Sequence, residues 1–354
     1  MTVKGIQIQN IYYMLAYAFK ALREGVYSNM SGEDFEHVED LFGEILSLGL
    51  SHLLKRGLHR MYEDVHEDMA GLRGKIDMTG TIRHLLNKRQ VISCVHDEFS
   101  VNNGFNQILK TTAVALLDTG KLERSGKRLK RALSFFGDVD TLDIRRIRWS
   151  ALRYERNNLH YLMLINVCKF VIDGLLLDET HSGNRRIREM EIDEGNMASL
   201  YEGFIREYYV RHYDLHAMSK QIAWDVPPGT DESLLPKMQS DVMLSDTLKT
   251  LIIDAKFYGS IMQMNWERFS IRNSHLYQML AYVNNQQAVE PRKPVRGMLL
   301  YAKTSEDALE PATWTISGHD IAVRVLDLAK PFADISNQLD EIAITSFGAR
   351  RKKQ

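Results

Sequence analysis

Two aspartates and one lysine in the second half of the chain have the residue types of a cation-dependent hydrolytic site. Asp241 ends the segment Pro236–Asp241 (PKMQSD), and Asp254 and Lys256 end the apolar run in Leu251–Lys256 (LIIDAK). Carboxylate oxygens are ligands that Mg²⁺ prefers in proteins, and charges at the end of a buried strand are costly unless they are paired or bound to a metal. The three side chains therefore indicate either a site for a divalent cation with a lysine beside it or a structural Asp–Lys ion pair.

A β-hairpin is the element that would position these side chains. Two apolar runs of residues that favour strands, Met238–Leu244 and Leu248–Tyr258, flank a short polar stretch. This is the pattern of two antiparallel strands joined by a tight turn. We expect Asp246 and Thr247 to be the two residues of that turn.

The register of this hairpin decides which side chains share a face of the sheet. It places Asp241 opposite Ile252, and residues two apart on one strand project to the same face. Asp241, Asp254 and Lys256 then lie on one side, with about 7–8 Å between the backbones of the two aspartates. A three-residue turn would reverse the parity and separate them. We therefore expect both aspartates to share one Mg²⁺, with a charged Lys256 beside it to orient and polarise water.

The pattern P-x4-D followed by I-D-A-K resembles the signature of the PD-(D/E)xK nuclease superfamily. Longer blocks resemble the McrC family, the nuclease subunits of McrBC 5-methylcytosine-dependent restriction systems. These blocks are Asn10–Phe19 (NIYYMLAYAF), Gly71–Ile76 (GLRGKI), Asn106–Thr111 (NQILKT), Val167–Val171 (VCKFV), Leu200–Phe204 (LYEGF) and Tyr277–Tyr282 (YQMLAY). Because the blocks occur in order over most of the chain, the resemblance is specific.

The resemblance implies an α+β chain with two domains. The first, residues 1–180, would be a mainly helical domain with small β elements that docks to a partner. The second, residues 181–354, would be a PD-(D/E)xK endonuclease domain with a mixed central sheet flanked by helices. The polar, turn-rich stretch 178–184 (DETHSGN) is the candidate boundary.

The implied activity is that of a Mg²⁺-dependent DNA endonuclease subunit in a 5-methylcytosine-dependent restriction complex. The implied partner is a hexameric AAA+ GTPase resembling McrB, which this subunit would bind and stimulate. The chain contains no G-x4-G-K-[ST] phosphate-binding loop, so the nucleotide site is expected on the partner. Two alternatives remain open: a non-catalytic activator of a ring NTPase, and a free-standing repair nuclease of the same fold.

The order of predicted elements in the second half agrees with the PD-(D/E)xK core. That core has the order helix, strand, strand, strand, helix, strand. The predicted elements are a helix at Asn196–Tyr213, a first core strand at Gln221–Val226, the two hairpin strands, a helix at Ser274–Val283 and a strand at Gly297–Ala302.

Two helical residues are further candidates for the site. Glu202 either contributes to the metal site, as a first-helix glutamate does in many PD-(D/E)xK enzymes, or closes a capping box with Ser199 at a helix start. Gln278 and Tyr282 are four residues apart and share a helix face. They resemble the Q-x3-Y element of some branches of the superfamily; the alternative is a polar residue beside a core tyrosine.

A basic connection in the first half is a candidate contact for the partner. Residues 59–80 alternate charged and apolar positions, which indicates strands around Tyr62–His66 and Lys75–Met78 joined through Leu72–Gly74. Arg73 and Lys75 lie in or beside this connection, and loops on rigid scaffolds often carry binding contacts. The alternative is an ordinary hairpin turn.

Composition limits the class of protein. The 354 residues are 44% hydrophobic and 26% charged, with a net charge of −1, so the chain as a whole is not a basic nucleic-acid binder. Locally, Lys121–Arg131 and Arg145–Arg156 are strongly basic; they are either solvated helix faces or contacts to phosphate or to an acidic partner. Cys94 and Cys168 lie in apolar runs, and no membrane span or signal peptide is evident, so we expect a cytoplasmic protein.

Overall fold

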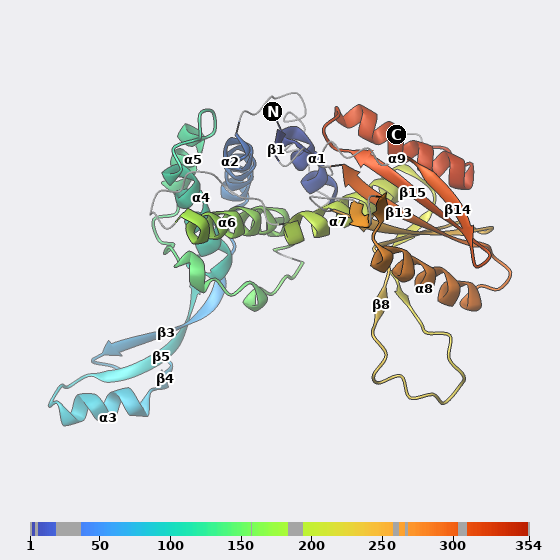
Figure 1. Cartoon of the computed structure of the whole chain (residues 1–354). Coiled ribbons are helices and arrows are strands. Elements are labelled where there is room, and N and C mark those ends of the chain that lie inside the picture. Colours follow the sequence, from blue (N-terminus) through green and yellow to red (C-terminus); the bar gives the residue numbers. More distant parts are fainter. Residues whose placement is uncertain are drawn as a thin grey trace. The chain divides into compact units, whose positions relative to one another are not determined.

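The structure is a computed structural model that describes residues 2–3, 6–18, 37–156, 158–182, 194–257, 262–265, 268–303 and 310–352. Its contacts divide the chain into two compact units (Figure 1). We call residues 1–41 and 189–354 the sheet unit, and residues 42–188 the helical unit. The predicted α+β class, with a mainly helical first half and a mixed sheet flanked by helices in the second, is confirmed.

The predicted boundary at residue 180 places residues 1–41 in the first domain, whereas in the structure they belong to the sheet unit. Helix α1 (Ile8–Ala18) packs against α7 (Glu194–His212) in the sheet unit. The ring of Tyr17 lies 5.5 Å from that of Phe204 and 5.6 Å from that of Tyr208. The helical unit is therefore an insertion in the sequence of the sheet unit. The docking and endonuclease roles of the two parts stay predictions.

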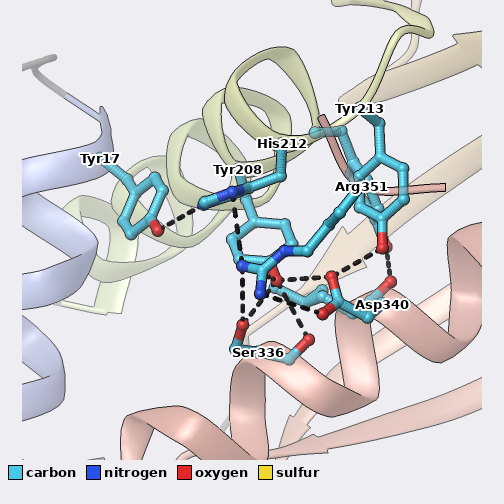
Figure 2. Close-up of polar contacts among 9 residues, drawn as sticks. Tyr17, Tyr208, His212, Tyr213, Ser336, Asp340 and Arg351 are labelled. Carbon is cyan, nitrogen blue, oxygen red and sulfur yellow. Dashed lines mark hydrogen bonds and ion pairs between the residues drawn. The ribbon is translucent and has the colours of Figure 1, made fainter. Parts of the chain in front are cut away.

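A polar network also joins α1 and α7 to the C-terminal segment, as Figure 2 shows. His212 Nε2 lies 2.8 Å from Tyr17 Oη, and the other ring nitrogen, Nδ1, lies 3.3 Å from an Arg351 nitrogen. Because Arg351 can only donate, His212 Nδ1 accepts and Nε2–H donates to Tyr17. Burial, followed by the charge of Arg351, lowers the pKa of His212 to about 4, so the imidazole is neutral at pH 7.

The helical unit consists of a helix bundle and a small sheet. The helices are α2 (Val38–Arg56, which begins in the sheet unit), α4 (Gly104–Asp118), α5 (Gly126–Leu133), α6 (Leu162–Ser182) and the short 3-10 helices η3 (Ile144–Arg146), η4 (Trp149–Ala151) and η5 (Leu159–Tyr161). The small sheet contains β3 (Met61–Met69), β4 (Lys75–Ile76) and β5 (Ile92–Ser100), with α3 (Met78–Leu86) beside it. Within this unit, the small sheet and α3 extend away from α4 and α6 (Figure 1).

The connection through Leu72–Gly74 is not the ordinary hairpin turn that was the alternative for it. The strands exist as β3 and β4, but β5 lies between them and pairs with both. Gly74, before β4, has φ +72°, and a Cβ there would meet the Val95 carbonyl oxygen of β5 at 2.3 Å. Glycine thus permits the close approach that places β4 on the far edge of β5. Helix α3, which was not predicted, begins after Asp77, whose carboxylate accepts the Thr79 N–H (3.0 Å).

The sheet unit is built on a six-stranded sheet with strand order β14-β15-β13-β10-β9-β6. The central strands β10 (Thr250–Lys256), β13 (Val295–Lys303) and β15 (His319–Asp327) are parallel. The strands β14 (Ala312–Ile316), β9 (Val242–Ser245) and β6 (His216–Met218) pair antiparallel toward the two edges. Short ladders outside this sheet join β1 (Thr2–Val3) with β2 (Ile6–Gln7), β7 (Gln221–Ile222) with β8 (Met238–Gln239), and β11 (Met262–Asn265) with β12 (Arg268–Ile271).

Helices cover both faces of this sheet (Figure 1). Helix α8 (Asn273–Val289) connects the parallel strands β10 and β13, and Met279, Tyr282 and Val283 pack it into one apolar core with the sheet. At Gly297 of β13, a Cβ would meet the Met279 side chain at 2.6 Å, so glycine permits close packing of α8. Helix α9 (Phe332–Phe347) covers the other face and is bonded to α7 through Tyr208 and Tyr209.

The predicted first core strand, Gln221–Val226, is wrong in position. The strand that joins the large sheet is β6, whereas β7, at Gln221–Ile222, pairs only with β8. The strand is interrupted because Ser240 fills the gap between the two ladders: its N–H donates to the Lys220 carbonyl (3.0 Å), and its hydroxyl accepts the Lys220 N–H (3.2 Å).

Cys94 and Cys168 are free and buried, as their apolar sequence contexts indicate. Within the described ranges, no helix combines the length and hydropathy needed to cross a membrane.

Candidate active site

The hairpin β9–β10 brings the two aspartates opposite one another. Its ladder pairs Ser245 with Thr250 and Val242 with Ile253, and one further step places Asp241 opposite Asp254. The predicted register, with Asp241 opposite Ile252, is wrong by two residues. Because side chains alternate with a period of two, this error leaves Asp241 and Asp254 on the predicted common face.

The turn explains the difference in register. Residues 246–249 form a four-residue connection instead of the predicted two-residue turn. The Asp246 carboxylate oxygen Oδ1 accepts the N–H groups of Leu248 and Lys249, both at 2.8 Å. This side-chain acceptor stabilises the longer loop, since aspartate readily bonds to the backbone just after it.

A β-bulge at Asp241 ends the regular pairing there. Met218 pairs with Met243 and Gln221 pairs with Gln239, so residues 219–220 on one strand stand against residues 240–242 on the other. The extra residue breaks the ladder, and bulges near active sites re-aim side chains in this way. The Asp241 carboxylate oxygen Oδ2 instead accepts the Ala255 N–H of β10 at 2.7 Å. The sequence pattern had predicted one continuous strand here and missed the bulge.

Asp254 and Lys256 form a buried ion pair at the end of β10. Asp254 is fully buried, and its oxygen Oδ2 lies 2.7 Å from Lys256 Nζ. Asp254 Oδ1 is also buried and accepts no hydrogen bond from the residues that the structure describes. A buried carboxylate oxygen without a donor is costly, so the site has an unsatisfied preference for a proton or a cation.

Gln278 of α8 binds the Lys256 ammonium group on the face of the sheet that α8 covers. Lys256 Nζ donates to Gln278 Oε1 (3.1 Å), Gln278 Nε2 donates to Tyr282 Oη (2.8 Å), and Tyr282 Oη donates to the Gln239 carbonyl (3.0 Å). The predicted common face of Gln278 and Tyr282 is thus present. This chain of donors fixes the orientation of the amide with its oxygen toward the ammonium group.

Glu202 is the third carboxylate whose charge affects the site. The capping-box alternative is wrong, because α7 begins at Glu194 and Ser199 therefore lies inside the helix. Burial raises the pKa of Glu202, and the charge of Asp254 raises it further, whereas Lys256 lowers it. Its half-buried side chain therefore lies within electrostatic range of Asp254 and Lys256.

Burial and the two neighbouring carboxylates all act on Asp241. Burial, the charge of Asp254 and the charge of Glu202, in that order, raise the pKa of Asp241 to about 8. The bond from the Ala255 N–H and the charge of Lys256 act in the opposite direction. Without a cation, the site therefore retains a proton on Asp241 at neutral pH.

His275 lies beside the site and was not predicted. Its Nδ1 is 2.8 Å from Tyr301 Oη, and Tyr301 pairs with Lys256 between β13 and β10. Burial, followed by the charge of Lys256, lowers the pKa of His275 to about 4. The spacing His275-x2-Gln278-x3-Tyr282 along one face of α8 is the signal that could have indicated it.

The residues present fit a Mg²⁺ site. In the described part of the chain, no three His, Cys, Asp or Glu side chains gather closely enough to hold a metal together, so the direct protein ligands would be the facing Asp241 and Asp254. Mg²⁺ is commonly held by one or two carboxylates, with water and substrate phosphate completing its shell. The buried, donor-free oxygen of Asp254 and the retained proton on Asp241 both indicate a place for positive charge.

Arg73 and Lys75, the predicted partner contacts, belong to the helical unit. Arg73 lies in the connection between β3 and β4, and Lys75 begins β4; both side chains are exposed. Exposed apolar side chains surround them in this small sheet, including Leu72 (61% exposed) and Ile76 (44% exposed). The connection is thus accessible in this chain.

The chain is similar to known components of restriction systems. The Type IV methyl-directed restriction enzyme EcoKMcrBC of Escherichia coli (strain K12) is 29% identical over 344 residues, which are 95% of this chain and 97% of that protein. Two Thermococcus gammatolerans structures are more distant. One, of McrB AAA+ hexamers with bound McrC, has a TM-score of 0.46 at 16% identity and covers 93% of this chain and 76% of that one. The other, of the McrBC complex, has a TM-score of 0.41 at 20% identity and covers 58% of each.

A family model extends the match across both units. The model described as McrBC 5-methylcytosine restriction system component matches residues 4–302, from before α1 to Ala302 in β13. That span contains the facing aspartates, Lys256 and the α8 residues above them. The chain therefore belongs to the family of McrBC 5-methylcytosine restriction system components.

Proposed function

We propose that this chain is the Mg²⁺-dependent endonuclease subunit of its restriction system. One observation carries the proposal: Asp241 faces Asp254 across β9 and β10, with Lys256 2.7 Å from Asp254 on the same face. Two acids and an ammonium group in this arrangement suit phosphodiester hydrolysis, which requires charge stabilisation and an activated water. The family match supports the same reading.

Each residue then has a distinct task. Asp241 and Asp254 would hold Mg²⁺, which when bound supplies positive charge that acidifies water and offsets the negative charge of the phosphoryl group. Lys256 stays charged beside two carboxylates and orients the attacking water. Gln278 fixes the Lys256 ammonium at 3.1 Å, and Glu202 adds negative charge that favours cation binding.

The structural alternative, a stabilising ion pair, explains less of the arrangement. An Asp–Lys pair would be satisfied by Asp254 and Lys256 alone. It would not require Asp241 to be buried opposite Asp254, where burial, followed by the charges of Asp254 and Glu202, raises the pKa of Asp241 to about 8. Strongly perturbed pKa values of buried acids cluster at functional sites.

The experiment that tests the proposal is Asp254→Asn in the complex with the partner. Asparagine keeps the shape of the side chain but removes the charge that would hold the cation. We expect DNA cleavage to fall by at least about a thousandfold, whereas stimulation of the partner GTPase persists. The measurements are DNA cleavage and GTP turnover in the same samples.

A matched control is Asp327→Asn, which removes an Asp–Lys contact (Lys303 Nζ to Asp327 Oδ2, 3.5 Å) at the ends of neighbouring strands in the same sheet. This variant is expected to cleave DNA normally. Unchanged cleavage by Asp254→Asn would favour a non-catalytic activator. Cleavage by the isolated chain, without any partner, would favour a free-standing repair nuclease.

We also propose that the partner is a hexameric AAA+ GTPase of the McrB kind. The chain has no phosphate-binding loop of its own, and it belongs to a family of multi-component restriction systems. The exposed connection with Arg73 and Lys75 is the proposed contact. If this connection contacts the partner, the double change Arg73→Ala and Lys75→Ala lowers the stimulation of the partner GTPase. Recognition of modified DNA is proposed to belong to the partner.

A further inference from the structure

We propose that the helical unit binds a DNA strand at the arginine-rich segment Arg145–Arg156, with one unstacked base in the cavity beside it. The ligand class rests on the proposed function, because a nuclease subunit must meet DNA. The binding site itself is separate from the Asp241–Asp254 pair. The basic segment Arg145–Arg156 has no part in the proposed catalytic site, and DNA binding would give it a role.

The cavity has an apolar floor of fixed shape. Its volume is about 400 Å³, and its lining includes Phe105, Ile108, Leu142 and Leu152. Phe105 is 1% exposed and Ile108 is 2% exposed, so both are held in the core of the unit. Tyr154, at the surface, meets the Phe105 ring edge-on at 5.4 Å. The half-buried Leu142 and Leu152 side chains are the apolar surface that the cavity offers to an unstacked base.

Guanidinium groups stand at the rim of this cavity. Arg146, Arg148 and Arg153 line it. Within the described ranges, the Arg148 and Arg153 side chains form no hydrogen bond or ion pair, and Arg146 makes a 3.4 Å contact with an exposed Asp143. Unpaired guanidinium groups bind phosphate oxygens through several donors each. Three at one rim are suited to consecutive phosphates of a strand.

Two 3-10 helices and the residues that flank them present these arginines: Arg146 lies in η3, Arg148 precedes η4 and Arg153 follows it. Asp143 caps η3, where its carboxylate accepts the Arg145 N–H at 3.0 Å, and η4 follows after a short extended step. The tighter turns of 3-10 helices and the extended residues between them keep the arginines exposed. Trp149 and Tyr154 lie among the five arginines of Arg145–Arg156, an interleaving of basic and aromatic residues typical of single-strand binding.

An oriented amide adds a hydrogen-bond acceptor to the cavity wall. Gln107 Nε2 donates to Asn102 Oδ1 (2.9 Å), and Asn102 Nδ2 donates to Asp140 Oδ2 (2.6 Å). Both amides line the cavity. Their mutual bond leaves Gln107 Oε1 without a donor in the described part of the chain, so it can accept from the amino group of a base. An acidic protein partner would use the arginines but would have no need of this cavity.

The test uses the full-length chain in an Asp254→Asn background, so that DNA is not cut. Fluorescence anisotropy measures its affinity for a labelled single-stranded oligonucleotide and for a duplex over a series of salt concentrations. The double change Arg148→Gln and Arg153→Gln should weaken single-strand binding by about a hundredfold and reduce the slope of log K against log salt by about 1.4, which is about 0.7 per lost phosphate contact. Thermal unfolding verifies that each variant is folded.

The matched control is Lys127→Gln with Lys130→Gln, which removes two exposed charges from α5 outside this cavity. It should leave affinity within about threefold. A second pair of variants tests the role of the cavity independently of the arginine charges. Ala151→Trp, at a residue that lines the cavity, should weaken single-strand binding without changing the salt slope, whereas Ser150→Trp, at its exposed neighbour, should not.

Three results would overturn the inference. One is equal weakening by the arginine pair and the lysine pair; another is an unchanged salt slope in the arginine variant. The third is a loss of partner binding with DNA affinity intact, which would assign the segment to an acidic protein surface. Failure of the nuclease proposal is distinguishable, because it would appear as residual cleavage by Asp254→Asn and would leave the affinity comparison unaffected.

Discussion

At the scale of single residues, the site is defined by how burial and charge act on Asp241. It is held opposite Asp254, accepts a backbone N–H, and has a pKa raised to about 8 by burial and by two neighbouring carboxylates. A carboxyl group with such a pKa is protonated at neutral pH unless a cation replaces the proton. Ionising Asp241 without a cation is unfavourable because the carboxylate is buried and lies near two other carboxylates. A divalent cation would remove this cost, so the same groups favour its binding.

This cost predicts a pH dependence of stability. The folded-state pKa of Asp241 lies above its unfolded value, so the folded protein binds more protons between pH 4 and 8, and unfolding becomes easier as pH rises through that window. We expect Asp241→Asn to raise the melting temperature at pH 9 more than at pH 5, measured in a chelator. Equal effects at both pH values would show that Asp241 ionises freely in the folded chain.

At the scale of elements, the common face of Asp241, Asp254 and Lys256 depends on strand parity and on one helix. The hairpin fixes the parity, the bulge at residues 240–242 turns Asp241 toward Ala255, and α8 brings Gln278 over Lys256. The close approach of α8 depends on Gly297, where a Cβ would meet Met279 Sδ at 2.6 Å.

Gly297→Ala tests that dependence. The added methyl group must displace the Met279 side chain, and overpacking of this kind costs about 1–3 kcal/mol. We expect a lower free energy of unfolding in urea and slower DNA cleavage, because α8 also carries Gln278. Gly137→Ala is the control, since a Cβ at that position would have no described atom within 4 Å. Normal cleavage by Gly297→Ala would show that the rate of DNA cleavage does not depend on the close packing of α8.

The same elements show what the sequence could and could not predict. Hydrophobic periodicity located α7, β10, α8 and β13, and parity placed the acids on one face even though the register was wrong by two residues. The four-residue turn depends on Asp246 accepting two backbone N–H groups. The bulge depends on Ser240 bonding to Lys220, twenty residues away. Such specific polar contacts leave no periodic pattern in a sequence.

At the scale of the whole molecule, the sheet unit is assembled from both ends of the chain. The helical unit is inserted in sequence between α1 and α7, and the network in Figure 2 fixes α1, α7 and the C-terminal segment together. Arg351 is its centre. It donates to Tyr208 Oη and Ser336 Oγ, both at 3.2 Å, and pairs with Asp340 at 3.4 Å.

Arg351→Met should therefore lower the free energy of unfolding of the sheet unit. The variant keeps an unbranched apolar stem but removes the hydrogen bonds of the guanidinium group and leaves Asp340 without its cation, at a cost of about 1–2 kcal/mol. Chemical denaturation measures this loss. Arg350→Met, at an exposed neighbour, is expected to change stability by less than about 0.5 kcal/mol. Equal stability of the two variants would mean that the network does not hold the termini.

The most direct test of the central claim is calorimetric titration of the full-length chain with Mg²⁺ or Mn²⁺ near neutral pH. Wild type is expected to bind the cation with release of a proton, because Asp241 retains one before binding. Asp241→Asn and Asp254→Asn should each abolish this binding, and Asp327→Asn should preserve it. Unchanged cation binding in both site variants would contradict the assignment of the facing aspartates as the metal site.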